Sequence, residues 1–355
     1  LTRLARYNNS ATPDWDVTTD IDPNFSEINL MEQEGNNLYL AGFGRYDLST
    51  DTTSDFILLK YDLGGNRQFA IEFKSTDSST DPTSDKDGVV VKMGKSPSGD
   101  LYLAGMSLYD SSPDEWQKIF VAKLLYNSTG DGDIIYEIPL NGSTKNKLTD
   151  LAFDISGDLY LTGQIEGSFE GASTDALDAF VLKLNSSGTK QWSQLVGDAS
   201  DNYNHGFLEK RGDDDSTDDH RLIDNFYLLT SRPGSYPTLT KHNLTAGNVD
   251  ATRDFNTINS DYGSYYEIDS SDDIYLIGRD LSADIRLEKV DQNLSYQWDK
   301  TIGDPAQPEI PKAVLSDEMD NLLIIGETMG SVDGNTNKGG WDIFMIKYDR
   351  QGNKL

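Results

Sequence analysis

The stretch Gly157-Asp-Leu-Tyr-Leu-Thr-Gly163 joins a tight turn to a short apolar strand that ends in glycine. A turn rich in Ser, Gly and Asp stands before most copies of this pattern, and another short apolar strand stands before the turn. Two strands joined by such a turn predict a β-hairpin. The aromatic-led run recurs at Tyr39–Gly42, Tyr102–Gly105, Tyr160–Gly163 and Tyr275–Gly278, with weaker copies at Tyr227–Thr230 and Leu323–Gly326.

A second pattern follows each copy after a loop of variable length. An alternating strand ends in a cation, and an Asn/Asp turn follows. After Arg6, Lys60, Lys183 and Lys289 an aromatic residue stands nine positions later, as in Asp178-Ala-Phe-Val-Leu-Lys-Leu184 followed by Gly188 and Trp192. This spacing predicts a second hairpin. The cations fall at Arg6, Lys60, Lys123, Lys183, Lys241, Lys289 and Lys347.

The repeating unit is therefore hairpin, variable loop, hairpin, which is a four-stranded antiparallel sheet. Such sheets bury both faces when they pack radially, so the sequence predicts an all-β fold, a β-propeller, as a single domain over 1–355. The third and fourth strands of one blade are expected at 1–20. Further repeats are expected at about 24–75, 87–140, 148–198, 205–256, 262–303 and 310–355.

These motifs resemble the bacterial and archaeal family of seven-bladed β-propeller repeats (SBBP-type repeats). The resemblance covers nearly the whole chain and implies a secreted or cell-surface protein, often one without an assigned activity. It favours seven blades. The chain starts at a third strand and stops at Leu355, where a fourth strand is due, so six blades with one spare strand is the alternative.

Composition narrows the classes of partner. The 60 acidic and 30 basic residues give a net charge of -30, which repels phosphate backbones and anionic membranes and excludes nucleic acid as an expected partner. No apolar run has the length of a membrane span, so no membrane insertion is expected. With no cysteine, disulfides, thiolate metal sites and cysteine nucleophiles are excluded.

Acidic loops make calcium the expected cofactor, if there is one, because calcium takes six to eight oxygen ligands. No loop has the full helix-loop-helix calcium pattern, and Asp in a turn also accepts backbone hydrogen bonds without a metal. The candidate ligands are Asp77, Asp81, Asp85 and Asp87, the pair Asp131 and Asp133, and the group Asp269, Asp272 and Asp273.

Seven Asn-x-Ser/Thr sequons predict glycosylation if the protein is extracellular, but turns between third and fourth strands favour Asn for backbone reasons alone. The sequons are Asn8, Asn24, Asn127, Asn141, Asn185, Asn243 and Asn293. The repeated cations are expected at exposed sheet positions, paired with nearby carboxylates. Trp15, Trp192 and Trp298 are expected to pack between blades.

The sequence favours a non-enzymatic extracellular propeller that binds a glycan or protein, mediates adhesion or has a structural role. No catalytic residue stands out. The alternative is a polysaccharide-active hydrolase or lyase, with a site at the axial mouth or in the region 205–242, which holds His205, His220 and His242. That region also reads as an elongated, solvated loop. The loops between second and third strands vary most in length and are expected to contact partners.

Overall fold

The structure is a computed structural model. It describes residues 3–7, 13–18, 27–44, 55–73, 88–108, 116–124, 132–139, 145–169, 172–174, 176–197, 202–208, 210–211, 220–222, 225–317, 319–332 and 334–355. Every regular element within these ranges is a β-strand, and the strands of the repeated hairpins pair antiparallel, as at 145–166 and 285–302. The same ranges contain no helix long and apolar enough to cross a membrane.

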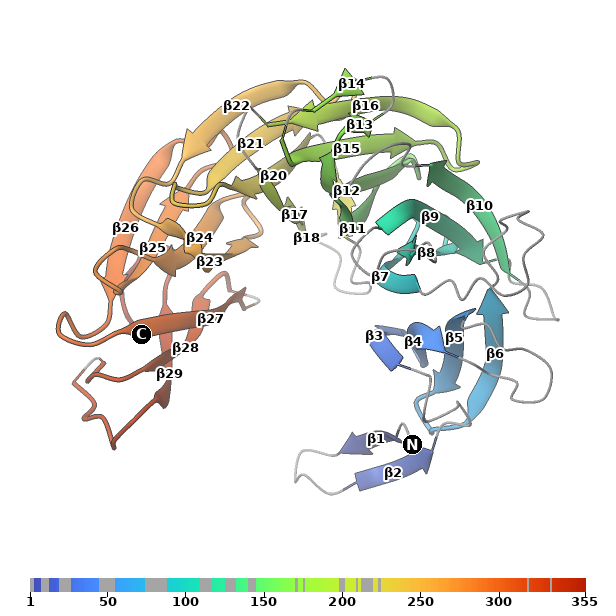
Figure 1. Cartoon of the computed structure of the whole chain (residues 1–355). Helices are drawn as coiled ribbons and strands as arrows, with labels where there is room; N and C mark the ends of the chain where they lie inside the picture. The colour runs from blue at the N-terminus through green and yellow to red at the C-terminus, as the bar shows by residue number, and fades with distance from the viewer. Residues whose placement is uncertain are drawn as a thin grey trace. The chain divides into compact units, whose positions relative to one another are not determined.

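The chain divides into two compact units, the first built from 1–193 and 216–219 and the second from 194–215 and 220–355. The first unit begins with a two-stranded sheet, β1 (Arg3–Tyr7) and β2 (Pro13–Thr18) (Figure 1). One four-stranded sheet follows with β3 (Glu27–Glu34), β4 (Asn37–Gly44), β5 (Asp55–Asp62) and β6 (Arg67–Phe73). The next has β7 (Gly88–Lys95), β8 (Leu101–Leu108), β9 (Trp116–Leu124) and β10 (Gly132–Pro139).

A further sheet contains β11 (Lys145–Asp154), β12 (Leu159–Glu166), β15 (Asp178–Leu184) and β16 (Lys190–Val196). The loop between its second and third strands carries a small hairpin of β13 (Ser168–Phe169) and β14 (Ala172–Ser173).

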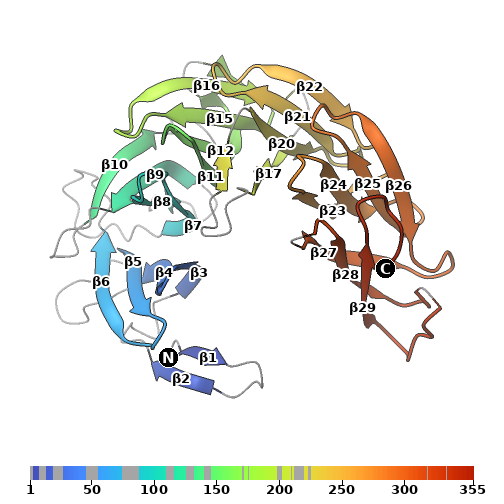
Figure 2. The same cartoon turned by 180° about the vertical axis from the view of Figure 1, so that it is seen from behind.

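The second unit holds two four-stranded sheets and one three-stranded sheet (Figure 2). The first consists of β17 (Tyr203–Leu208), β20 (Asn225–Ser231), β21 (Thr238–Asn243) and β22 (Val249–Asp254). The stretch of chain between β17 and β20 forms a short antiparallel pair, β18 (Lys210–Arg211) and β19 (His220–Leu222), which is not part of this sheet. The second consists of β23 (Asn259–Ile268), β24 (Ile274–Arg279), β25 (Ile285–Val290) and β26 (Tyr296–Ile302). The third consists of β27 (Glu309–Ser316), β28 (Leu322–Thr328) and β29 (Asp342–Tyr348).

Strand order follows the chain in the sheets built from the repeat, as two successive hairpins require. The register is the same from one sheet to the next. The aromatic that leads the second strand lies opposite the cation of the third strand, as for Tyr160 and Lys183 or Tyr275 and Lys289. Lys289 in turn pairs with Trp298, nine positions later. The nine-residue spacing is therefore the register of a hairpin.

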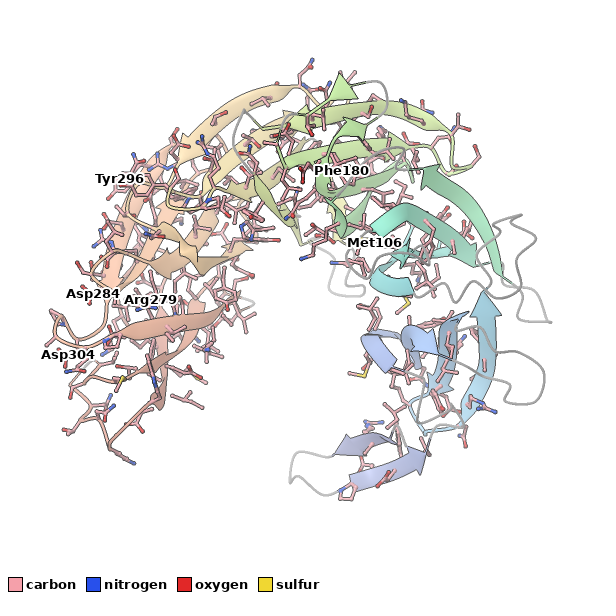
Figure 3. All side chains as sticks on the ribbon, viewed as in Figure 1. Met106, Phe180, Arg279, Asp284, Tyr296 and Asp304 are labelled. Atoms are coloured by element: carbon pink, nitrogen blue, oxygen red, sulfur yellow. The ribbon has the colours of Figure 1, made fainter. Side chains whose placement is uncertain are left out.

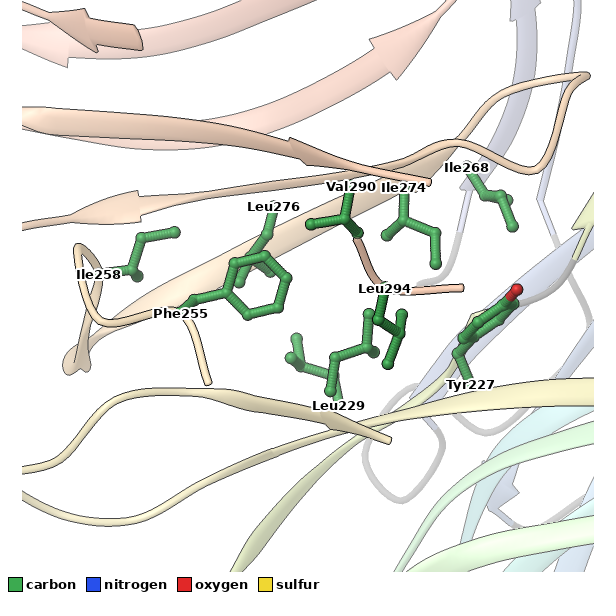
Figure 4. Close-up of a cluster of buried hydrophobic side chains, with 10 residues drawn as sticks. Tyr227, Leu229, Phe255, Ile258, Ile268, Ile274, Leu276, Val290 and Leu294 are labelled. Atoms are coloured by element: carbon green, nitrogen blue, oxygen red, sulfur yellow. The ribbon is translucent and has the colours of Figure 1, made fainter. Parts of the chain in front are cut away.

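Neighbouring sheets pack face to face. We call the face that a sheet turns to the next sheet its forward face and the opposite face its rear face. Figure 4 shows one such interface in the second unit, where Tyr227 and Leu229 meet Ile274, Leu276 and other buried residues. The next interface repeats it, with the forward-face residues Tyr275, Ile277, Ile285 and Leu287 against the rear-face residues Val314, Leu322, Ile324 and Ile346.

A polar contact accompanies this apolar packing. Lys289 Nζ and Trp298 Nε1 both donate to the carbonyl oxygen of Arg350, which lies in the turn between the third and fourth strand positions of the next sheet. Arg6 and Trp15 donate in the same way to Leu63 O. Trp15 and Trp298 thus pack between sheets as predicted. Trp298 also packs against Tyr275 of its own sheet, with ring centroids 5.9 Å apart, and Trp192 packs against Tyr160 of its own sheet at 5.8 Å.

Candidate functional site

The turn between first and second strands carries a repeated cluster of Asp, Tyr and Lys. Asp154 is its hub in the first unit. One carboxylate oxygen accepts the backbone N–H groups of Ser156 and Asp158. The other accepts the Tyr160 hydroxyl and the Lys183 ammonium group, each at 3.0 Å. Burial, together with the charge on Asp154, raises the pKa of Tyr160 above its ordinary value, so the hydroxyl stays a donor.

The second unit repeats this cluster around Asp269. Its carboxylate accepts the N–H groups of Ser271 and Asp273 and the hydroxyl of Tyr275. Lys289 approaches Asp273 to 2.7 Å. The prediction of a carboxylate partner for the repeated cation is therefore confirmed. The prediction of an exposed cation is wrong here, because only 7% of the Lys289 side chain is exposed. The next sheet covers it.

The contacts of this turn bear on the calcium prediction. Lys289 and Arg350 already neutralise Asp269 and Asp273, and the hydrogen bonds of the turn occupy the Asp269 oxygens. Asp272 occupies the left-handed position of the turn, with φ of 65°. In the part of the chain that the structure describes, no three His, Asp or Glu side chains form a group that could hold a metal ion. These contacts stabilise the turn without a metal ion, and calcium binding there stays a prediction.

The other calcium candidates cannot be placed in the same way. Asp77, Asp81, Asp85, Asp87 and Asp131 lie outside the described residues. The backbone of Asp133 belongs to β10, and its side chain lies outside the described set.

Three of the sequons fall in described turns. The Asn185 and Asn243 side chains cap their turns, accepting backbone N–H groups from Thr189 and Ala246 respectively. In the turn that contains Asn293, the capping side chain is that of Asp291, which accepts the N–H groups of Asn293 and Ser295. Turn chemistry therefore accounts for Asn185 and Asn243. Asn8, Asn24, Asn127 and Asn141 lie outside the described residues.

His242 and His205 lie in different environments. His242 is fully buried on β21 and stacks on Phe226, with ring centroids 4.8 Å apart. Its Nδ1 lies 2.9 Å from Gly247 O, so Nδ1 carries the hydrogen, and Nε2 accepts from Thr240. His205 pairs with Ser231 at 2.6 Å. His220 lies on β19, and its side chain is outside the described set. His242 is therefore a core residue.

Replacing His242 with phenylalanine is expected to flatten the loss of stability on mild acidification. Burial lowers the pKa of His242 below its unfolded value of 6.5. The neutral ring therefore contributes stability above pH 6.5, and this contribution is lost as pH falls through the folded pKa. Urea unfolding between pH 7.5 and pH 5.5 measures the effect. Parallel curves for the two proteins would contradict it.

A carboxylate cluster that the sequence patterns missed lies at the opposite end of the sheets from the Asp–Tyr–Lys turns. Asp284 ends the loop between β24 and β25, and Asp304 lies in the loop between β26 and β27 (Figure 3). Glu309 begins β27 and is completely buried. Its Oε1 accepts the Asp304 N–H and the Thr328 hydroxyl, whereas Oε2 has no hydrogen-bond partner.

The pKa values of these carboxyl groups are not all shifted in the same direction. Burial, aided by the charges of Asp284 and Asp304, raises the pKa of Glu309. Burial also raises the pKa of Asp284. Backbone N–H groups of Ser331 and Ala306 lower the pKa of Asp304. Neighbouring carboxyl groups whose pKa values are shifted apart are an arrangement used in acid–base chemistry. No sequence signal distinguished these three residues among 60 acidic ones.

The Glu309→Gln variant is expected to be more thermostable than the parent chain at pH 8. Because the folded pKa of Glu309 lies above its ordinary 4.5, stability is lost as pH rises from 4.5 through the folded pKa. The amide removes that charge and keeps an acceptor for Thr328. The matched variant, Asp304→Asn, should lower the melting temperature at pH 8, since the pKa shift of Asp304 has the opposite sign. A pH-independent effect of Glu309→Gln would contradict the assignment.

No protein-family model matches the chain, and no curated protein matches it. Among solved structures, the apo form of prolyl oligopeptidase B from Galerina marginata is similar, with a TM-score of 0.52 and 12% identity over 93% of this chain and 43% of that one. A Hadza microbial sialidase has a TM-score of 0.47 and 8% identity over 85% of this chain and 63% of that one.

Trypanosoma rangeli sialidase in complex with the inhibitor DANA has a TM-score of 0.44 and 11% identity over 99% of this chain and 58% of that one. The chain thus spans less than two thirds of each of these three structures. The likeness to prolyl oligopeptidase B is one of fold alone. Together with the repeated sheets, it identifies the chain as an all-β protein, a β-propeller of four-stranded antiparallel blades.

Proposed function

We propose that the chain is a non-enzymatic extracellular or cell-surface β-propeller that serves as a binding, adhesion or structural module. We also propose that its repeats belong with the bacterial and archaeal seven-bladed β-propeller repeats. The observation that carries the first proposal is the Asp–Tyr–Lys cluster. Its buried polar groups bind one another and lock the turns, as at Asp154 and Asp269. The polar residues of the repeat therefore stabilise a rigid scaffold.

A rigid scaffold leaves recognition to the loops. Two loops between second and third strands expose large aromatic side chains, Tyr236 and Trp341, at 40% and 47%. Exposed aromatic rings suit stacking on sugars or packing against protein side chains. The net charge of -30 disfavours nucleic acid and anionic membranes as partners. An extracellular glycan or protein is therefore the proposed partner.

The labelled chain, applied to a glycan array and to cell-surface protein fractions, should show saturable binding. Tyr236→Ala and Trp341→Ala should weaken that binding roughly tenfold each, as loss of an aromatic anchor does. Tyr296→Ala is the matched control, since Tyr296 is as exposed but lies at the opposite end of its sheet, beside the turn between third and fourth strands. Absence of binding throughout, or equal losses for all three variants, would refute the proposal.

A polysaccharide-active hydrolase or lyase is the second candidate. The closeness of Glu309 to Asp304 and the opposite directions of their pKa shifts favour it, because glycoside hydrolysis uses two carboxyl groups with different roles. We rank the hydrolase or lyase function second because Glu309 is completely buried, so a substrate cannot touch its carboxyl group in this structure. Polysaccharide turnover that both Glu309→Gln and Asp304→Asn abolish would reverse this order.

A further inference from the structure

Glu309, at the start of β27, connects three segments of the second unit. Its backbone N–H donates to the carbonyl oxygen of Ala283, in the turn between β24 and β25. Its carboxyl oxygen Oε1 accepts the Asp304 N–H at 3.1 Å and the Thr328 hydroxyl at 2.9 Å. One residue thus holds together the turn between β24 and β25, the loop between β26 and β27, and the end of β28.

The loop between β26 and β27 is also bound to the beginning of the loop between β28 and β29. Asp304 accepts the Ser331 N–H at 3.1 Å, and the carbonyl oxygen of Pro308 accepts the Met329 N–H at the same distance. Gly330 packs so closely that a Cβ atom there would collide with the Asp304 side chain. The two loops therefore contact each other directly as well as through the buried carboxyl group.

The surroundings of the Glu309 carboxyl group oppose a negative charge. The residue is completely buried, and Oε2, with which a Cβ atom at Gly303 would collide, has no hydrogen-bond partner. Burial and then the charges of Asp284 and Asp304 raise its pKa. Asp280 adds a further negative charge, which acts on Asp284 from the same turn.

Two cations of the same sheets are bound to other carboxylates. Arg286 on β25 acts on Asp284 but binds Asp299 at 2.7 Å, and Lys312 on β27 binds Glu327 at 3.1 Å. Loss of the proton from the buried carboxyl group therefore creates a negative charge that faces two other acidic side chains. Such a charge is costly inside a protein, and the cost is relieved when the group moves into water.

We propose that Glu309 is a pH-sensitive switch: its neutral carboxyl group holds the two loops together, and loss of the proton drives the side chain out of the interior and releases them. The loop between β28 and β29 also carries Trp341, for which we propose a role in partner binding. On that proposed function, on which this consequence alone rests, the partner binds more strongly at acidic pH than at alkaline pH.

Hydrogen–deuterium exchange of the loops tests the switch without any ligand. The parent chain and Glu309→Gln are compared at each pH between 5 and 8, so that the intrinsic pH dependence of exchange cancels. Strand β25, which is hydrogen-bonded on both sides, is the internal reference. The reporting amides, each hydrogen-bonded in this structure, are those of Asp304, Ala306, Met329, Gly330 and Ser331.

At pH 8 these amides should exchange roughly tenfold faster in the parent chain than in Glu309→Gln, because only the parent can ionise and open. The difference should shrink as the pH is lowered to 5, since the closed arrangement is lost only as pH rises through the folded pKa. Glu327→Gln is the matched control. Glu327 precedes Thr328 but its side chain is 36% exposed, so this variant should keep the pH dependence of the parent.

Equal exchange of the parent chain and Glu309→Gln at pH 8 would overturn the proposal. So would a difference of the same size at pH 5 and pH 8, because a carboxyl group with a purely structural role gives no pH dependence. The measurement uses no ligand, so its failure is distinguishable from a failure of the proposed binding function.

Discussion

Replacing Asp154 with alanine is expected to lower the free energy of unfolding by about 3 to 5 kcal/mol, the usual cost of removing one partner from a buried, hydrogen-bonded charge pair. Asp154 is 6% exposed at its side chain and binds Lys183, Tyr160 and two backbone N–H groups. Without it, the Tyr160 hydroxyl loses its hydrogen bond to the carboxylate. Chemical denaturation at neutral pH measures the change.

A matched variant separates burial from turn chemistry. Asp62 caps the turn between β5 and β6 with the same geometry, accepting the N–H groups of Gly64 and Asn66, but this turn is exposed. Hydrogen bonds from Asn66 lower the pKa of Asp62, so its carboxylate is ionised at neutral pH. Asp62→Ala should cost much less than Asp154→Ala. Equal losses would show that the buried cluster adds nothing beyond a turn cap.

The Gly163→Ala variant is expected to lose about 3 kcal/mol of stability, because overpacking a dense interior forces backbone or ring shifts. A Cβ atom at Gly163 would collide with the Lys147 carbonyl oxygen of the adjacent strand and would lie 2.7 Å from the Phe180 ring. This crowding explains why the second-strand pattern ends in glycine. Differential scanning calorimetry measures the loss.

Gly157 is the matched control for this glycine. It lies in the turn that leads into the same strand, with φ of +83° and open space around it, so alanine there meets only backbone strain. Gly157→Ala should cost about 1 kcal/mol. A larger loss at Gly157 than at Gly163 would mean that backbone conformation, and not packing, fixes the glycine pattern.

The strands and their register could be predicted from the sequence because both are local. Nine residues separate Lys289 from Trp298 since a hairpin turn of fixed length lies between them, and the two residues are direct cross-strand partners. Residue alternation likewise indicated that one side of each strand is apolar. The pairing of the repeated cation with a carboxylate followed from the same local pattern.

The burial of those cations could not be predicted, because it depends on the neighbouring sheet. Lys289 is covered because the turn at Arg350, 61 residues later, supplies its carbonyl acceptor. The carboxylate cluster could not be predicted either, because it also depends on how separate elements pack. Asp284 lies in a loop and Glu309 begins a strand of the next sheet, and only packing distinguishes them from the many solvated acidic residues. In His242, likewise, stacking on Phe226 decides the role, and sequence spacing does not reveal it.

Hydrogen–deuterium exchange, resolved by peptide, tests the central claim that the chain is a series of antiparallel sheets that share one strand register. We expect the amides of β12, β15, β24 and β25 to exchange slowly, since each strand is hydrogen-bonded on both sides. The amides of β29 should exchange much faster than those of β25, because β29 has only β28 beside it apart from the bridge at Lys354. Equal protection of β25 and β29, or no recurrence of slow exchange in the second and third strands, would contradict the account.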